Sequence, residues 1–483
     1  MGDIKVPRII LLSLDYTRPK DPPQSVGHAT ILANLIHHEI ATVERSWAVN
    51  HPSFSTEEVI SFIKRYAHDE VLIGFGGFVW NEPYIQKIVA EIKQQNIPGR
   101  IVLGGPQVSY IRNNPDIEEL SSDRLKKLYP GVDIFIRGYA DGALVELVQS
   151  QEKFPKIQGV YFPASSEPDD SLSAKVDLNS AISPLLTGTL KPKHFLRWET
   201  KRGCPFRCAF CQHTAPDANK VYQFSEQRIM DEAEWILAHK EIQDIAVIDP
   251  TFNIPGTLYK EVLRKFIRGG YTGKLSLQCR MEYVDDEFLT LIQQLNKTAE
   301  VTLEFGLQTV FQNEQKIIRR LSNLEKVKEV LKKTKKLGIR TDVSLIYGLP
   351  EQTVESFIQS IEFLVDLEVS QIHAFPLMLL HGTLLYEKKE IYGLKESLDP
   401  IPYVVSSNSF SEEEYKTMCS IANSLDAYNG LSDHSKKDFD IRERSVKKFN
   451  FADYLVKQMF FKKQTVHNIS ILRKNDLKVL AAK

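Results

Sequence analysis

The fold of this 483-residue chain is best read outward from the stretch KRGCPFRCAFCQH, residues 201–213. The stretch contains three of the chain's five cysteines, in the spacing C-x3-C-x2-C: Cys204, Cys208 and Cys211. The other two, Cys279 and Cys419, are far away in sequence. A disulfide scaffold would need an even, dispersed set of cysteines in a much shorter chain. Clustered thiols in a large chain indicate a metal site instead.

Three thiolates in one short loop suit an iron–sulfur cluster, because sulfur ligands and iron are both soft. Such a loop can hold three corners of a cubane cluster, and with no fourth thiolate nearby the fourth iron stays open to a substrate. Two alternatives remain at this point. His213 could complete a Cys3His zinc site, or the thiols could be inert and buried.

The cysteine loop follows the first of six predicted strands that alternate with helices. These strands are Phe195–Thr200, Asp244–Ile248, Lys274–Gln278, Glu300–Phe305, Arg340–Ile346 and Gln371–Phe375. Helices are predicted between them, for example at Gln227–Leu237, Glu325–Lys336 and Val354–Leu367. Six βα units in succession predict a partial (β/α)6 barrel, whose active site would lie at the carboxyl ends of the strands.

Before the barrel, the pattern predicts a separate α/β domain with a doubly wound parallel sheet. Its predicted strands are Arg8–Leu14, Ala41–Trp47, Val71–Phe75, Ile101–Leu103 and Asp133–Ile136. Ligands bind such sheets beyond the carboxyl ends of the strands. Glycine there lets a ligand approach the backbone closely, although tight turns also use it. The residues at these ends are Asp15, Gly76, Gly77, Gly104, Gly105, Pro106, Gln107 and Gly138.

Composition sets the domain boundaries and excludes several classes of protein. We predict a first domain at residues 1–160, a linker at 161–193, the barrel at 194–390, and a small, mostly helical extension at 391–483 that becomes basic toward its end. The net charge of −1 argues against general attraction to nucleic acid or membranes. No apolar run is long enough for a transmembrane helix, and no signal peptide is visible. These features predict a cytoplasmic monomer.

The cysteine spacing, with an aromatic residue before the last cysteine and a partial barrel around it, resembles the radical S-adenosylmethionine (SAM) superfamily. Further turns resemble that family, among them Glu304–Thr309 (E-x-G-L-Q-T) and Gly348–Thr353 (G-L-P-x-x-T). The resemblance implies a [4Fe–4S] cluster on Cys204, Cys208 and Cys211, with SAM chelating the open iron. One electron would then cleave SAM to a 5′-deoxyadenosyl radical, with a flavodoxin- or ferredoxin-type donor as partner.

The resemblance also suggests residues around SAM: Phe210, Asp249, Arg280, Glu304, Gln308, Ser344 and Tyr347. Phe210 would pack beside the adenine. Asp249 stands where other members carry a Gly-Gly-Glu that holds the methionyl amine. Arg280 could pair with the methionyl carboxylate and Glu304 could accept ribose hydroxyls. For both residues, an internal barrel ion pair is the alternative.

An N-terminal doubly wound domain placed before the cysteine motif resembles the cobalamin-binding subgroup of the superfamily. The resemblance implies cobalamin at the glycine-bearing turns. The chain lacks the D-x-H-x-x-G motif that supplies a histidine to cobalt in other cobalamin proteins, so we expect cobalt without a histidine ligand.

The function implied is methylation of an unactivated carbon in a small molecule or natural-product intermediate. Radical rearrangement, cyclisation or another group transfer, with or without cobalamin, is the alternative among enzymes. A non-catalytic iron–sulfur or zinc protein is the alternative from a different class. Fold alone does not choose among these outcomes.

Overall fold

The computed structural model describes residues 6–18, 20–21, 25–112, 124–175, 177–213, 220–399, 401–431, 436 and 441–442. Its N-terminal sheet has the order β2-β1-β3-β4-β5-β6, with only β6 antiparallel. The strands are β1 (Ile9–Asp15), β2 (Thr42–Ala48), β3 (Leu72–Gly76), β4 (Arg100–Gly104), β5 (Ile134–Ile136) and β6 (Val160–Tyr161). All residues of β1 are buried, as expected for a central strand covered on both faces.

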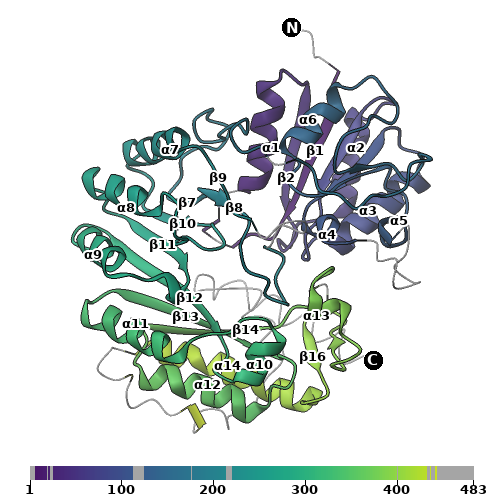
Figure 1. Cartoon of the computed structure of the whole chain (residues 1–483). Helices are drawn as coiled ribbons and strands as arrows, with labels where there is room; N and C mark the ends of the chain where they lie inside the picture. The colour runs from purple at the N-terminus through teal and green to yellow at the C-terminus, as the bar shows by residue number, and fades with distance from the viewer. Residues whose placement is uncertain are drawn as a thin grey trace.

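Helices cover both faces of this sheet, which confirms the predicted doubly wound domain (Figure 1). They are α1 (Val26–His37), α2 (Thr56–Tyr66), α3 (Glu82–Gln94), α4 (Pro106–Ser109), α5 (Arg124–Leu128) and α6 (Asp141–Gln149). On one face α1 and α6 bury Leu35 and Leu144, and on the other α2 and α3 bury Ile63 and Ile88. Ser25 and Ser55 cap α1 and α2 through their hydroxyls.

The second large sheet is the predicted partial barrel, with six parallel strands in the order β14-β13-β12-β11-β10-β7. These strands are β7 (Phe195–Trp198), β10 (Asp244–Val247), β11 (Lys274–Cys279), β12 (Glu300–Gln308), β13 (Arg340–Tyr347) and β14 (Gln371–Pro376). The helices around them are α7 (Glu226–Ala238), α8 (Tyr259–Arg268), α9 (Asp286–Leu295), α10 (Gln312–Ile317), α11 (Leu324–Lys336) and α12 (Val354–Asp366), with a 3-10 turn at Met281–Tyr283.

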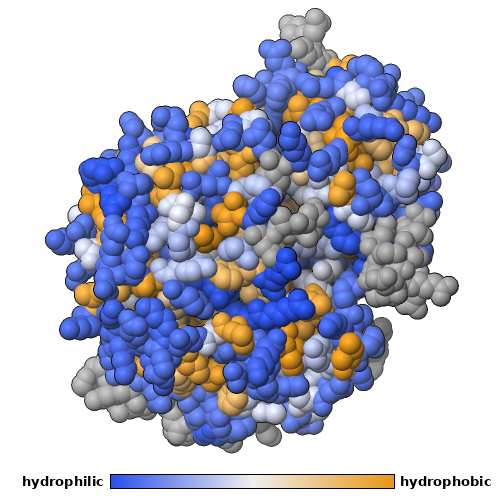
Figure 2. Space-filling model, viewed as in Figure 1, coloured by the Kyte–Doolittle hydropathy of each residue, from blue (hydrophilic) through white to orange (hydrophobic). Residues whose placement is uncertain are grey.

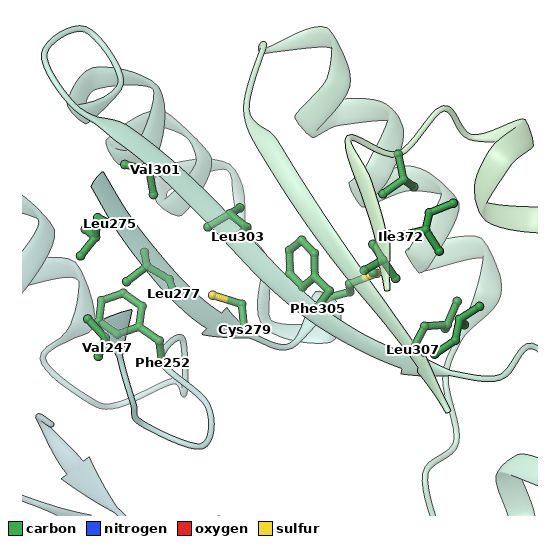
Figure 3. Packing of buried hydrophobic residues seen from close by; sticks show 14 of the residues in the cluster. Val247, Phe252, Leu275, Leu277, Cys279, Val301, Leu303, Phe305, Leu307 and Ile372 are labelled. Carbon is green, nitrogen blue, oxygen red and sulfur yellow. The ribbon is translucent and has the colours of Figure 1, made fainter. Parts of the chain in front are cut away.

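Alternate residues of the barrel strands point outward and form the main core beneath the helices. Figure 3 shows Leu277, Leu303 and Phe305 packed side by side in this layer, with the Cys279 sulfur among them. Cys279 is 5% exposed. It is therefore a small apolar core residue, and the opposite faces of the strands are left to line the barrel interior.

The segment between the two domains is packed rather than extended. Asp169 receives two hydrogen bonds from the buried Arg137 guanidinium, at 2.5 and 2.6 Å. The Ala174 N–H donates to the Arg137 carbonyl. Further along, Leu178 and Leu185 join the core of the barrel. The proposed linker of residues 161–193 thus contacts both domains.

The C-terminal part closes one edge of the barrel. It comprises α13 (Leu384–Glu387), the antiparallel pair β15 (Lys395–Glu396) and β16 (Val404–Ser406), and α14 (Glu412–Asn429). A capping box of Ser411 and Glu414 begins α14, and Cys419 is buried in it. The basic end of the predicted extension, from residue 443 on, lies outside the described residues. Among the described residues, no helix combines the length and hydrophobicity needed to cross a bilayer.

Candidate active site at the cysteine loop

The cysteine loop leaves the barrel between two short strands, β8 (Lys201–Arg202) and β9 (Tyr222–Gln223), which pair with each other. At its start, Gly203 has a φ of +81°. A Cβ at this position would lie 2.3 Å from the Lys220 carbonyl oxygen, so only glycine fits. The Ala209 N–H donates to the Ile318 carbonyl at 2.8 Å, which fixes the middle of the loop to the segment after α10.

All five cysteines are free thiols. Burial raises the pKa of the Cys204 thiol, and it raises that of Cys211 to about 12. A metal centre would therefore have to displace protons from these thiols. Within the described part of the chain, no three His, Cys, Asp or Glu side chains converge on a single metal ion. In a cubane cluster each thiolate binds a different iron, so the three cysteines need not converge on a single ion.

Two arginines lie beside the cysteine loop. The Arg280 guanidinium lies 3.8 Å from the centre of the Phe206 ring and forms a 3.2 Å ion pair with Glu282. The Arg320 Nη1 lies 3.8 Å from the Cys208 Sγ. Its Nε is buried without a hydrogen-bond partner. An unpaired buried donor beside the thiolates fits an anionic ligand group such as a carboxylate.

Arg320 is a site residue that the sequence analysis missed. It lies after a short helix, in no pattern that would single it out, and reaches the cysteines only through the tertiary fold. Arg280, which the sequence analysis did predict, lies on the same side of the loop: the two arginines line one cavity of about 450 Å³.

Asp249 has no free oxygen facing the site. It is 0% exposed and accepts hydrogen bonds from the Thr200 N–H at 2.7 Å, the Thr200 hydroxyl at 2.5 Å and the Lys201 N–H at 3.1 Å. The Lys201 ammonium, itself 1% exposed, lies 3.1 Å away. These contacts give Asp249 the role of fixing the start of the cysteine loop, and they do not support contact with the methionyl amine.

The interior face of the barrel carries Glu304, Asp342, Ser344 and His373. Glu304 pairs in register with Asp342, and Ser344 with His373. The pKa of Glu304 is raised, first by burial and then by the Asp342 carboxylate. His373 Nε2 lies 3.6 Å from an Asp342 oxygen. Glu304 thus faces Asp342, whereas Arg280 does have an internal partner, Glu282, as the ion-pair alternative predicts.

The remaining residues predicted around SAM divide between the two sides of the barrel wall. Phe210 is half-buried against the core beside Cys211. Gln308 ends β12 after a bulge, and its side chain lies close to Gly306. Tyr347 is fully buried and packs on Phe357 and Tyr415. Tyr347 therefore belongs to the helical layer, and its contacts do not support a place beside SAM.

The carboxyl edge of the N-terminal sheet meets the cysteine loop directly (Figure 1). Arg202 Nη1, at the start of the loop, lies 2.7 Å from Asp141 of α6. The pKa of Tyr110, just after α4, is raised by burial first and also by its neighbours Tyr139 and Cys211. The two domains thus place strand ends of one sheet against the cysteines of the other.

A partly buried carboxylate joins the two domains at the same edge. Glu82, at the start of α3, accepts hydrogen bonds of 2.5 Å from both Tyr129 and Gln107. His381 from the barrel lies 3.4 Å from Glu82, and its carbonyl accepts from Gln212 of the cysteine loop. The Gln107 Oε1 atom is buried without a partner. An unpaired acceptor at this strand end fits a ligand that carries amide donors, as a corrin does.

The glycine-bearing turns contact each other as well as this edge. The Gly77 N–H donates to the Gly104 carbonyl at 2.8 Å, and the Gln107 N–H donates to the Gly77 carbonyl at 3.1 Å. Asp15 is 7% exposed, accepts from Ser13 and has a pKa raised by burial. Close packing between the backbones of the turns thus explains some of the glycines at the strand ends without any ligand.

We predict that Gly105→Ala destabilises the N-terminal domain. Gly105 has a φ of +90°, and a Cβ there would lie 2.6 Å from the Gly77 carbonyl oxygen. Strain of this kind costs about 1–3 kcal/mol, so the urea midpoint should fall. The control is Gly142→Ala, where a Cβ meets nothing within 4 Å and the midpoint should hold. Equal midpoints for both variants would contradict the packing.

Comparison with known proteins agrees with this geometry. Residues 198–364 match the family model of the radical SAM superfamily. The chain is 22% identical over 390 residues to 2-(S-pantetheinyl)-carbapenam-3-carboxylate methyltransferase of Streptantibioticus cattleyicolor, covering 72% of this chain and 55% of that protein. The chain spans about half the length of the curated relatives it matches first.

Two solved structures share the fold of nearly the whole described chain. The radical SAM methyltransferase TsrM from Kitasatospora setae, with tryptophan substrate and a SAM analogue, superposes with a TM-score of 0.65 at 14% identity, over 89% of this chain and 90% of that one. OxsB, a cobalamin-dependent SAM radical enzyme with aqua-cobalamin and SAM bound, gives 0.64 at 14% identity, over 99% and 76%. The predicted order of a doubly wound domain and a partial (β/α)6 barrel is confirmed as the fold.

Proposed function

We propose that the protein, whose residues 198–364 match the family model of the radical SAM superfamily, is a cobalamin-dependent radical SAM methyltransferase. Its substrate would be a small molecule, such as a natural-product intermediate with an unactivated carbon. The observation that carries the proposal is the meeting of the cysteine loop with the carboxyl edge of the N-terminal sheet, made by the 2.7 Å ion pair of Arg202 with Asp141. A methyl donor on one domain would thereby face a radical source on the other.

The residues present fit both cofactors. Cys204, Cys208 and Cys211 would hold the [4Fe–4S] cluster, and Arg280 and Arg320 would bind the SAM carboxylate beside it. Phe210, Gln308, Ser344 and Glu304 remain proposals for the rest of SAM. When bound, the cluster with SAM supplies hydrogen-atom abstraction and cobalamin supplies methyl transfer.

Cobalamin would lie at the turns after β1, β3, β4 and β5. The residues proposed there are Asp15, Gly76, Gly77, Gly104, Gly105, Pro106, Gln107 and Gly138. Gln107 is the one whose buried side-chain oxygen lacks a protein donor. As partners we propose a flavodoxin- or ferredoxin-type electron donor, and as context a cytoplasmic monomer.

The proposal is tested on the full chain, reconstituted anaerobically with iron, sulfide and hydroxocobalamin. We expect 5′-deoxyadenosine from SAM under dithionite, slowly without a substrate, and S-adenosylhomocysteine alongside it once a methyl acceptor is supplied. Cob(II)alamin should show no nitrogen splitting from a protein histidine in electron paramagnetic resonance. Fully clustered protein that never forms 5′-deoxyadenosine would overturn the radical assignment. Protein that binds no cobalamin would overturn methyl transfer alone and favour a cobalamin-free rearrangement.

A further inference from the structure

Basic and exposed residues of one segment border the cavity beside the cysteine loop. The cavity is lined by Phe206, Arg280, Lys316, Arg319, Arg320 and Leu321. Arg280 and Arg320 form its floor next to the cysteines, as described above. Lys316, Arg319 and Leu321, here called the basic rim, are exposed, and the Leu321 side chain is 61% exposed. In Figure 2, strongly hydrophilic side chains gather near the centre of the face, close to where Figure 1 labels α10.

The two cations of the basic rim form no ion pair with the described residues of the molecule. Within the described residues neither the Lys316 ammonium nor the Arg319 guanidinium forms an ion pair. Four of the six lysines on the neighbouring helix α11 do pair with carboxylates: Lys326, Lys328, Lys333 and Lys335. The whole chain has a net charge of −1, so the positive field of the rim is local. A local positive patch around an exposed leucine has the composition of a docking site for an acidic protein.

The basic rim lies on the backbone segment that touches the metal-binding loop. Ile318, between Lys316 and Arg319, accepts the hydrogen bond from the Ala209 N–H at 2.8 Å. Arg320, next to Arg319, reaches to 3.8 Å from the Cys208 sulfur. A protein seated on this rim would therefore sit directly over the side of the loop that carries Cys208, where an electron must arrive.

We infer that the basic rim is the docking site for an acidic, flavodoxin-type electron donor, an inference that rests on the proposed function. The donor's flavin hydroquinone would lose one electron and become the semiquinone. The cluster on the three cysteines would gain that electron. Charge attraction would raise the rate of encounter, by a factor of 10 to 10³ in comparable systems, and Leu321 would supply apolar contact.

The test is the double variant Lys316→Glu and Arg319→Glu in the reconstituted full chain. With flavodoxin reduced by its NADPH-dependent reductase, kcat/KM for flavodoxin in 5′-deoxyadenosine formation should fall about ten-fold or more at low salt. The rate should also lose its dependence on ionic strength, because attraction at the rim is what salt screens. With dithionite or reduced methyl viologen, the rate should stay within two-fold of wild type, since neither needs a docking surface.

The matched control is Lys64→Glu with Arg65→Glu on α2, which changes the net charge equally on the other domain, where both residues are exposed. It should leave flavodoxin-driven turnover unchanged. An equal loss in both double variants would assign the effect to net charge and overturn the inference, as would an undiminished rate in the rim variant. Absence of 5′-deoxyadenosine from the wild type with dithionite is a different failure, that of the proposed function.

Discussion

Replacing Cys204, Cys208 and Cys211 together by alanine should remove the iron–sulfur centre completely. Reconstituted wild-type protein should hold about four irons per chain, and the variant close to none, because the three thiolates are the whole protein ligand set of such a cluster. Formation of 5′-deoxyadenosine should disappear with the iron. Iron analysis, visible absorption and product chromatography under anaerobic conditions measure all three quantities.

The other two cysteines supply the control for this experiment. Cys279 is 5% exposed among apolar side chains of the barrel, and Cys419 is 1% exposed in α14. Alanine at either position should leave the iron content unchanged, with at most a modest loss of stability from the smaller side chain. Iron retained by the triple variant, or lost from Cys279→Ala, would show that the cluster is held elsewhere.

The cysteine cluster was predictable because its ligands are adjacent in sequence. The strands were predictable because apolar runs and the glycines after them are local patterns as well. Strand ends were less predictable. A strand was predicted at Phe195–Thr200, but β7 ends at Trp198, because the Thr200 N–H donates to Asp249 instead of to a neighbouring strand. That hydrogen bond joins residues 49 positions apart, so the local sequence around Thr200 could not predict it.

Strand parity explains the division between Ser344 and Tyr347. Successive side chains of a strand point to opposite faces, so two residues three positions apart cannot share a face of the regular strand β13. The structure places Ser344 on the interior side and Tyr347 under the helices. The alternation of side chains along the strand could therefore have excluded Tyr347 from the predicted site, given Ser344 in it. It could not have located Gln308, because the bulge after Gly306 changes the register of β12.

Charged residues were the least predictable part of the site, because burial and partners decide their role. Arg280 and Arg320 both lie beside the cysteine loop, yet only Arg280 follows a strand end where a ligand-binding residue is expected. Asp249 also follows a strand end, and its contacts are internal. A strand-end carboxylate therefore indicates either a ligand contact or a structural ion pair, and only its neighbours distinguish the two.

For Asp249 the structural role leads to a large expected effect on stability. Asp249→Ala should lower the free energy of unfolding by about 3–5 kcal/mol, because it leaves the Lys201 ammonium buried without its counter-charge. Both side chains are at most 1% exposed. Chemical denaturation of the protein without cofactors measures this loss directly, since a role in binding SAM would not affect that experiment.

A double-mutant cycle separates the ion pair from the other hydrogen bonds of Asp249. Lys201→Met alone should also destabilise the protein, since it leaves the Asp249 carboxylate buried without its cation. The double variant Asp249→Ala with Lys201→Met should lose less than the sum of the two single losses, because no unpaired charge remains. Some loss should persist in the double variant, since the Thr200 N–H and hydroxyl still lack the acceptor they have at 2.7 and 2.5 Å. If Asp249→Ala instead denatured like the wild type and only weakened SAM binding, the carboxylate would be a ligand of the methionyl amine, and its internal contacts would be incidental to its function.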